Sequence, residues 1–478
     1  MTGEIEYIAK RHLKAVLGIN AAGIAGLQGV NKCPNLVALY GDSLVAQTFM
    51  DPGVRLRRAA FNSINIANAL SGQRMVYVMK RAVSGWRSDE VLQRFLSDVE
   101  DGSLDASNAG TIIFTMGTND VAQGSYTDMV SGVAVTPVNV ADNVVANAAR
   151  LIDTCTARGI QCIFRTLHGS SNANAAQIAL FEDTNRKIGM LPYGRRMWLL
   201  ETREPLRDPL NTTNALYAFR AGHMMNDSGV LVHEAVPGAV AVGKRLAEIV
   251  RKAIPDLPSF YADGAVRYSS NLSSQLLTYP DFSGTTGTLG AGGTLGFNPF
   301  GGALAGVPTS WAAIRRSSDS TTTFTINVGE DMAGRYVEFV INTTNAGGIF
   351  FQYEVTSAAS KVLAGDNLRG FSTVEIMPGA VNLGAAAPAM EVNTVKTGVT
   401  SSLFTHGCHQ TGSFGAYPSS EQLVLEDATE VATIPAYDSI NWLVCRALDV
   451  KFTGAGSATV RVRRPRFEKV AAVPAIAA

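Results

Sequence analysis

The chain has 478 residues, of which 46% are hydrophobic, and its 40 Lys and Arg residues balance 40 Asp and Glu residues. This length is sufficient for two or three domains with cores of their own, so we expect a globular protein. The balanced charge gives no electrostatic attraction to nucleic acid or to an anionic membrane, and neither is expected as a partner.

The amino-terminal residues 1–34 are predicted to form a separate segment. Its apolar side chains can follow one side of a short helix, namely Ile5, Ile8, Leu13, Val16 and Leu17. Charged residues interrupt these positions, so the segment lacks the apolar core of a signal peptide, and no later run is long enough to cross a bilayer. We expect this helix to pack on the next domain, with oligomerisation or anchoring as the alternative.

Residues 35–254 alternate short apolar runs with helical patterns. The runs predicted as strands are 35–40, 75–80, 111–116, 161–167 and 196–201. The stretches predicted as helices include 54–70, 88–100, 140–159 and 236–254. Apolar runs separated by helices are typical of a parallel sheet buried on both faces in an α/β/α sandwich. Such a sheet binds its ligand at the carboxyl ends of the strands.

After a linker at 255–264, residues 265–470 have a different texture. Gly, Thr and Ser become frequent, and strand-like runs recur at 321–328, 334–344, 348–355, 372–379, 440–452 and 457–470. This pattern predicts an all-β sandwich of the jelly-roll kind, followed by a frayed tail at 471–478. Six aromatic residues could stack on sugar rings, although we expect at least half of them in the core: Trp311, Tyr336, Tyr353, Tyr417, Tyr437 and Trp442.

The five cysteines are scattered along the chain, at Cys33, Cys155, Cys162, Cys408 and Cys445. They lack the paired short spacings of a zinc site or of a disulfide framework. We therefore expect free thiols and no metal, with a bridge between Cys408 and Cys445 as the alternative.

The first predicted strand ends in Gly41, Asp42 and Ser43. Ser43 lies where this strand gives way to a helix, so its hydroxyl should emerge at the ligand edge beside helix amides that favour negative charge. Turn and capping chemistry would also explain a Gly-Asp-Ser tripeptide. The tripeptide alone therefore does not identify a nucleophile.

Two further strand ends carry hydrogen-bond donors. The second strand runs into Gly85, and the third runs into Asn119 and Asp120. A glycine lets its backbone N–H approach a bound atom, and an asparagine amide is a donor without charge. With the Ser43 amide, Gly85 and Asn119 could form an oxyanion hole, although Asn119 and Asp120 would also suit ordinary capping.

A serine nucleophile also needs a base. His233 is the best placed of six histidines, because it lies at the mouth of the last predicted helix. His168 follows the fourth strand and could line the pocket, although we favour a structural hydrogen bond for it. Asp42, Trp86 and His168 are the candidates for contact with a substrate.

These blocks resemble the SGNH, or GDSL, hydrolase family. YGDSL carries Ser43, VSGWRS carries Gly85, GTND carries Asn119 and HEAVPGA carries His233. The resemblance covers about 35–254 and implies a flavodoxin-like sandwich that hydrolyses esters without a metal or cofactor. It also implies that Ser43 is the nucleophile, that His233 is the base, and that Ser43, Gly85 and Asn119 hold the oxyanion.

One position departs from the family. Its aspartate usually lies three residues before the histidine, where this chain has Val230. Asp227, six residues before His233, could replace it if the loop bulges; otherwise a backbone carbonyl would orient the histidine. A Ser-His dyad could still hydrolyse esters, because the carboxylate improves the base without creating it.

We interpret the chain as a serine esterase that removes short acyl groups, above all O-acetyl, from a polysaccharide. A hydrolase followed by a jelly roll resembles carbohydrate esterases with glycan-binding domains, and also bacteriophage tail proteins. The alternatives are a lipase or thioesterase, and a glycan-binding or structural protein whose hydrolase site is weak or lost. The expected partner is an acylated carbohydrate or another ester. The sequence leaves open whether the chain forms a homo-oligomer, and whether it is located in a virion tail or in the cytoplasm.

Overall fold

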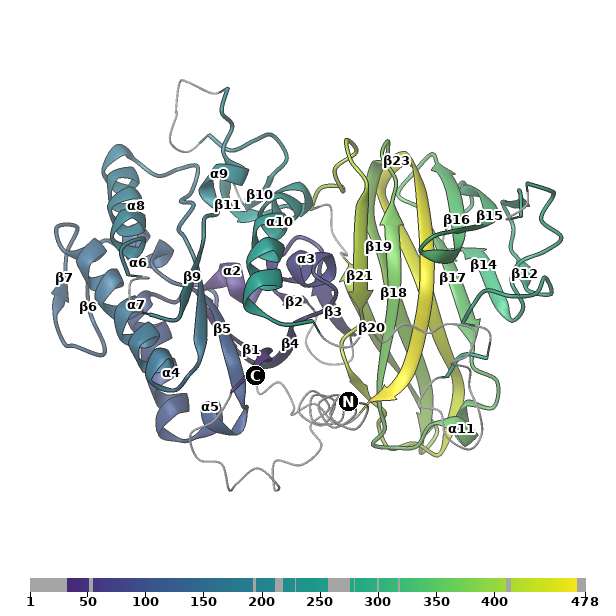
Figure 1. The fold of residues 1–478 in the computed structure, drawn as a ribbon, viewed down its shortest axis with the longest axis horizontal. Coiled ribbons are helices and arrows are strands. Elements are labelled where there is room, and N and C mark those ends of the chain that lie inside the picture. The colour runs from purple at the N-terminus through teal and green to yellow at the C-terminus, as the bar shows by residue number, and fades with distance from the viewer. Residues whose placement is uncertain are drawn as a thin grey trace, which may run out of the picture.

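The computed structural model describes residues 32–50, 55–191, 195–210, 218–227, 229–256, 276–278, 280–298, 301–316, 319–409 and 414–470. The predicted segment 1–34, the linker 255–264 and the tail 471–478 lie largely or wholly outside these residues. Figure 1 shows two parts side by side, a helix-rich part from the first half of the chain and a strand-rich part from the second half.

The first part is built on a five-stranded parallel sheet with the order β4-β1-β5-β8-β9. The strands are β1 (Cys33–Gly41), β4 (Val76–Ala82), β5 (Ala109–Thr115), β8 (Gln161–Arg165) and β9 (Met197–Leu200). All five apolar runs that the sequence predicts as strands are confirmed. The central strand β5 is buried along its whole length, as expected for a sheet that is covered on both faces.

Helices cover both faces of this sheet (Figure 1). They are α2 (Ser43–Ala46), α3 (Ser63–Leu70), α4 (Ser88–Glu100), α5 (Ser103–Ala106), α6 (Thr118–Gln123), α7 (Val140–Ala157), α8 (Ala175–Ile188), α9 (Arg203–Leu206) and α10 (Val236–Ala253). Alternate residues of β1 face opposite layers, because Leu39 packs in one core with α3 and α10 while Tyr40 packs in the other with α4 and α7. The predicted α/β/α class is confirmed.

The prediction of one helix over 54–70 is wrong in its first half. Residues Arg55–Ala59 form strand β3, which pairs with β2 (Phe49–Met50) and lies parallel to β20 (Val399–His409) of the strand-rich part. The edge of β20 offers backbone hydrogen-bonding groups that need partners, and this tertiary pairing overrides the local helical pattern. The first part thus contributes two strands to the sheet of the second.

The strand-rich part forms, with β2 and β3, a mixed 14-stranded sheet that branches. Its remaining strands are β12 (Thr288–Leu289), β13 (Gly293–Leu295), β14 (Trp311–Arg315), β15 (Thr323–Asp331), β16 (Gly334–Thr343), β17 (Ile349–Glu354), β18 (Asn367–Ile376), β19 (Val381–Lys396), β21 (Leu423–Ala428), β22 (Ala432–Thr433) and β23 (Ser439–Val470). A short helix, α11 (Ala358–Lys361), follows β17.

The long strand β23 joins the branches of this sheet. Its first half pairs with β17 and β19, and its second half pairs with β16 and β18. The two predicted strands 440–452 and 457–470 are therefore one continuous strand. The all-β class of the second part is confirmed, and a jelly-roll topology stays a prediction.

Half of the six aromatic residues singled out from the sequence are buried in the core of the second part. Trp311, Tyr353 and Tyr417 are buried, and the Trp311 ring stacks on Phe351 with a centroid distance of 4.7 Å. Trp442 is 38% exposed. The expectation that at least half of these rings fill the interior is therefore confirmed.

All five cysteines are described and each is a free thiol, so the alternative bridge between Cys408 and Cys445 is not formed. Among the described helices, none combines the length and apolar character needed to span a bilayer.

Candidate active site

The turn after β1 presents Ser43 at the carboxyl edge of the parallel sheet. Gly41 has φ +143°, and a Cβ there would lie 2.7 Å from the carbonyl oxygen of Thr115 in β5, so this close approach of two strands requires glycine. Asp42 caps helix α2, because its Oδ1 accepts a hydrogen bond of 3.0 Å from the Leu44 N–H. Ser43 then opens the helix.

Three side chains form a hydrogen-bonded chain at this edge. The Nε2 atom of His233 lies 2.8 Å from the Oγ of Ser43, and the Nδ1 atom of His233 is hydrogen-bonded to Asp227. A carboxylate at Nδ1 holds the proton on that nitrogen, which leaves the Nε2 lone pair directed at the serine hydroxyl. The His233 side chain is 16% exposed and that of Asp227 is 45% exposed, so a substrate can reach the group.

A hairpin supplies the carboxylate in place of the residue at Val230. Asp227 ends β10 (Met224–Asp227), and His233 lies in β11 (Val230–Glu234), with Asp227 directly opposite Val230. Gly229 adopts φ +91° in the turn, and its N–H donates to the Asn226 side chain at 2.7 Å. The Asn-Asp-Ser-Gly sequence is a turn signal that could have predicted this hairpin in place of a bulged loop.

The two predicted donors next to Ser43 lie on adjacent turns. Gly85 follows β4 with φ +88° and an exposed backbone, and Asn119 lies in the first turn of α6. The Asn119 Nδ2 atom donates a hydrogen bond of 2.8 Å to the Trp86 carbonyl, which orients the amide and leaves its second N–H to offer. The arrangement suits an oxyanion, because the Ser43 N–H also has no partner within its own helix.

The buried carboxylate of Asp120 fastens these two turns together. It accepts hydrogen bonds from the Ser88 N–H at 2.8 Å and from the Ser88 hydroxyl at 2.6 Å. Burial raises the pKa of Asp120, while these hydrogen bonds act in the opposite direction. Asp120 therefore holds the start of α4 beside α6 and so fixes the spacing of Gly85 and Asn119.

Two of the three candidates for substrate contact are buried. Asp42 and His168 have almost no exposed surface, so the expectation that they contact a substrate is not supported, whereas Trp86 is half-buried. Burial raises the pKa of Asp42 to about 7 and lowers the pKa of His168 to about 4. The neutral His168 lies with Nε2 2.8 Å from the Val232 carbonyl, next to His233, which is the structural role favoured from the sequence.

Two charged residues that sequence reasoning missed lie buried behind the site. Arg165 at the end of β8 and Glu234 at the end of β11 form an ion pair of 2.6 Å. A signal was present, because an arginine inside the apolar run 161–167 needs a buried partner.

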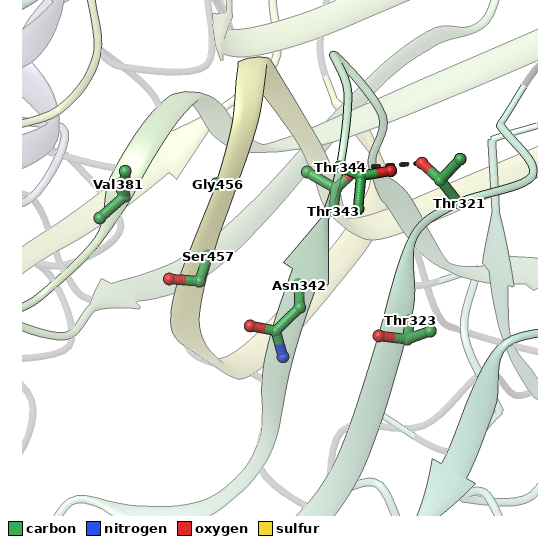
Figure 2. A pocket seen from close by; sticks show the side chains of 8 residues that line it. All are labelled: Thr321, Thr323, Asn342, Thr343, Thr344, Val381, Gly456 and Ser457. Carbon is green, nitrogen blue, oxygen red and sulfur yellow. Dashed lines mark hydrogen bonds between the residues drawn. The ribbon is translucent and has the colours of Figure 1, made fainter.

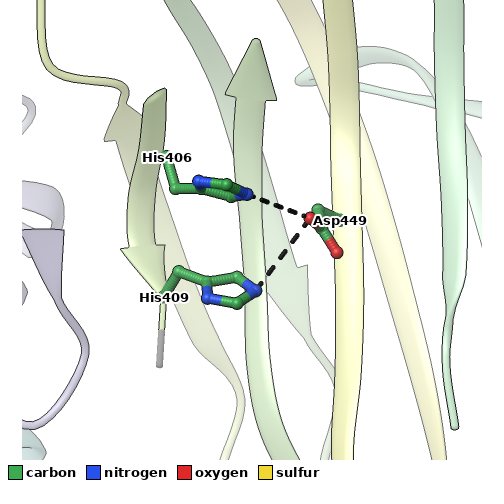
Figure 3. Close-up of side chains that lie close together, drawn as sticks. All are labelled: His406, His409 and Asp449. Atoms are coloured by element: carbon green, nitrogen blue, oxygen red, sulfur yellow. Dashed lines mark ion pairs between the residues drawn. The ribbon is translucent and has the colours of Figure 1, made fainter. Parts of the chain in front are cut away.

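Of the described residues, His406, His409 and Asp449 are grouped so that they could hold a metal ion, with ligand atoms within 4.8 Å of one another (Figure 3). Arg316 already supplies a positive charge there. Its guanidinium is hydrogen-bonded to Asp449, and its Nη2 atom lies 3.5 Å from the Nε2 of His409. A divalent cation would have to displace this arginine, so we interpret the cluster as a buried charge network of the strand-rich part.

A pocket of about 430 Å³ lies in the strand-rich part, lined by residues in or next to β15, β16, β19 and β23. Figure 2 shows its lining, which is mostly hydroxyl and amide groups and includes no charged side chain: Thr321, Thr323, Asn342, Thr343, Thr344, Val381, Gly456 and Ser457. Such groups can form hydrogen bonds with a neutral polar ligand.

Comparisons with known proteins give the following similarities. Neither the family models nor the curated proteins compared with the sequence give a match. Among solved structures, a GDSL-like lipase from Bacteroides thetaiotaomicron is 16% identical over 50% of this chain and 99% of its own, with a TM-score of 0.33.

Two acetyl xylan esterases are similar to the same degree. One is 16% identical over 45% of this chain and 99% of its own, with a TM-score of 0.32. The other, from Geobacillus stearothermophilus, is 13% identical over 48% of this chain and 100% of its own, with a TM-score of 0.34. At these identities and TM-scores, any chemical assignment rests on the geometry of the site itself.

Proposed function

We propose that this protein is a carboxylic ester hydrolase of the SGNH type, which removes short acyl groups, above all O-acetyl, from a polysaccharide. The observation that carries this proposal is the hydrogen-bonded chain from Asp227 through His233 to Ser43. A nucleophile, a base and an orienting carboxylate in this order are the parts that serine acyl transfer requires.

In the proposed reaction the Oγ of Ser43 attacks the ester carbonyl carbon while the Nε2 of His233 takes the hydroxyl proton. The carbonyl oxygen becomes an oxyanion, which the N–H groups of Ser43 and Gly85 and the side chain of Asn119 stabilise. His233 then gives its proton to the leaving alcohol. Water, activated by the same histidine, hydrolyses the acyl-enzyme and releases the acid.

A polysaccharide substrate is supported by the exposure of the site and by a pocket in the strand-rich part. The site is open to solvent at His233 and Asp227, which suits an ester carried on a large molecule. The pocket of Figure 2 is lined by hydroxyl and amide groups that can form hydrogen bonds with sugar hydroxyls. Its lining contains no aromatic ring on which a sugar could stack. We infer that the strand-rich part holds a neutral glycan through this pocket.

The alternatives differ in what the site must do. A lipase or thioesterase would act on small or lipid esters and would favour long acyl chains. A glycan-binding or structural protein, such as a bacteriophage tail component, would hold carbohydrate and hydrolyse esters weakly or not at all.

The test is hydrolysis of p-nitrophenyl acetate, butyrate and octanoate, with release of acetate from an acetylated polysaccharide measured in parallel. The proposal expects turnover of acetate esters, little turnover of octanoate, and release of acetate from the polysaccharide. A preference for octanoate would support the lipase, and a folded protein without activity on any substrate would contradict the esterase.

A further inference from the structure

The ion pair between Arg165 and Glu234 is buried directly beneath the candidate active site. The Nη2 atom of Arg165 lies 2.6 Å from the Oε1 of Glu234, and their side chains are only 1% and 3% exposed. Charges removed from water to this extent need partners on all sides. The partners of this pair lead to the two sides of the reacting group.

On one side, Arg165 contacts the backbone next to the serine. The Nη1 atom of Arg165 lies 3.3 Å from the carbonyl oxygen of Leu44, the residue that follows Ser43. The same carbonyl accepts a hydrogen bond of 3.0 Å from the Asn62 side chain. Helix α2 has four residues, too few to be stable by itself, so its position depends on such contacts from other elements.

On the other side the pair reaches the histidine. Glu234 follows His233 in β11, which belongs to a two-stranded ribbon and not to the main parallel sheet. The Glu234 carboxylate accepts hydrogen bonds from the N–H and the hydroxyl of Ser63, at 3.0 and 3.1 Å, at the start of α3. Glu234 therefore anchors the histidine strand to the body of the domain.

We propose that Arg165 and Glu234 are positioning residues that set the distance between the Oγ of Ser43 and the Nε2 of His233. This inference rests on the proposed function. Arg165 contacts the backbone next to Ser43, and Glu234 fixes the strand that carries His233. The ion pair joins these two contacts. Proton transfer from serine to histidine depends steeply on this distance, so loosening the link slows the chemical step more than it weakens binding.

The test compares two matched substitutions. Glu234→Gln keeps an acceptor oxygen for Ser63 and removes the charge that holds Arg165. Glu375→Gln makes the same change in the ion pair with Arg463, whose side chains are also buried, at 8% and 3% exposed, but which lies in the strand-rich part. For both variants, kcat and KM for p-nitrophenyl acetate are measured per active site, counted by covalent labelling with a fluorophosphonate, alongside Tm.

We expect Glu234→Gln to lower kcat about tenfold or more while KM stays within about twofold. Glu375→Gln should lower Tm and leave kcat per site unchanged. A second variant, Arg165→Lys, keeps the positive charge but loses the guanidinium group, whose two terminal nitrogens contact Leu44 and Glu234 at the same time. This variant should also lower kcat.

A kcat per labelled site equal to that of the wild type in both Glu234→Gln and Arg165→Lys would overturn the inference and leave the pair a purely structural contact. Counting by label keeps this comparison valid for a variant that folds in low yield. A wild type that hydrolyses no ester would instead overturn the proposed function, and this inference with it.

Discussion

The two parts of the molecule place the same residue types in opposite environments. In the first part, His233 and Asp227 lie at the edge of the sheet, partly exposed, with the hydroxyl of Ser43 as the third partner. In the second part, His406 and Asp449 lie in the interior, where the third partner is a charged arginine, Arg316.

This difference decides what each histidine can do. Burial lowers the pKa of His406, and its partner Asp449 is also hydrogen-bonded to Arg316, so that in the described part of the chain this pair is buried and its carboxylate is already paired with a charge. The pair of His233 and Asp227 is partly exposed and contacts the Ser43 hydroxyl. A His-Asp pair therefore becomes a base only where the fold also provides a nucleophile and a path for substrate.

The largest effect should come from removing the hydroxyl of Ser43. Ser43→Ala removes the attacking oxygen, so ester hydrolysis should fall by about 10⁴-fold or more. The measurement is kcat/KM for p-nitrophenyl acetate, with circular dichroism as the control for folding. Retention of wild-type activity would exclude Ser43 as the nucleophile.

Asp227→Asn should reduce kcat by about 10⁴-fold, because the variant no longer holds the histidine in its reactive tautomer. Steady-state kinetics measure this, and Tm should stay within about 2 °C because the side chain is half-exposed. An unchanged kcat would remove Asp227 from the reacting group and leave a Ser-His dyad.

The matching substitution in the second part should have the opposite signature. Asp449→Asn breaks the buried pair with Arg316 and should lower the free energy of unfolding by about 3 kcal/mol. The value of kcat per active site should not change. Denaturant unfolding measures the stability of the variant, and steady-state kinetics measure its kcat. A loss of activity without a loss of stability would contradict the purely structural role of Asp449.

The smallest expected effect concerns pH. The pKa of His168 falls from 6.5 to about 4 in the folded protein because of burial, so the unfolded state binds its proton more tightly. Stability is therefore fully present above pH 6.5 and is lost as pH falls toward about 4, by at most about 3 kcal/mol.

His168→Gln provides the matched control, because glutamine can donate to the Val232 carbonyl and does not titrate. Unfolding free energies at a series of pH values should fall less steeply for this variant than for the wild type. Parallel curves would show that His168 does not contribute to acid destabilisation.

Sequence reasoning worked best where local pattern and tertiary role agree. Strands of a parallel sheet are buried on both faces, so β1 and β5 read as continuous apolar runs, and the helix predicted over 88–100 coincides with α4. The meeting of Ser43 with His233 was predicted from the place of Ser43 at the end of the first strand and of His233 at the mouth of the last helix.

The remaining features depend on contacts between distant segments. Strand β3 forms because β20, about 350 residues later, offers its edge, and β19 was missed because its run of alanines has low strand propensity. Arg165 and Glu234 are 69 residues apart, so no local pattern could pair them. The hairpin that carries Asp227 is the exception, because it is local and its Asn-Asp-Ser-Gly turn signal could have predicted it.

The most direct test of Ser43 as the nucleophile is covalent labelling of the intact protein with a fluorophosphonate. The Ser43 oxygen should form a bond to phosphorus as the phosphorus–fluorine bond breaks, which leaves one adduct per chain, mapped to Ser43 by peptide mass spectrometry. Ser43→Ala should take no label. A folded wild type that takes no label, or that takes it at another residue, would contradict the assignment of Ser43 as an activated nucleophile.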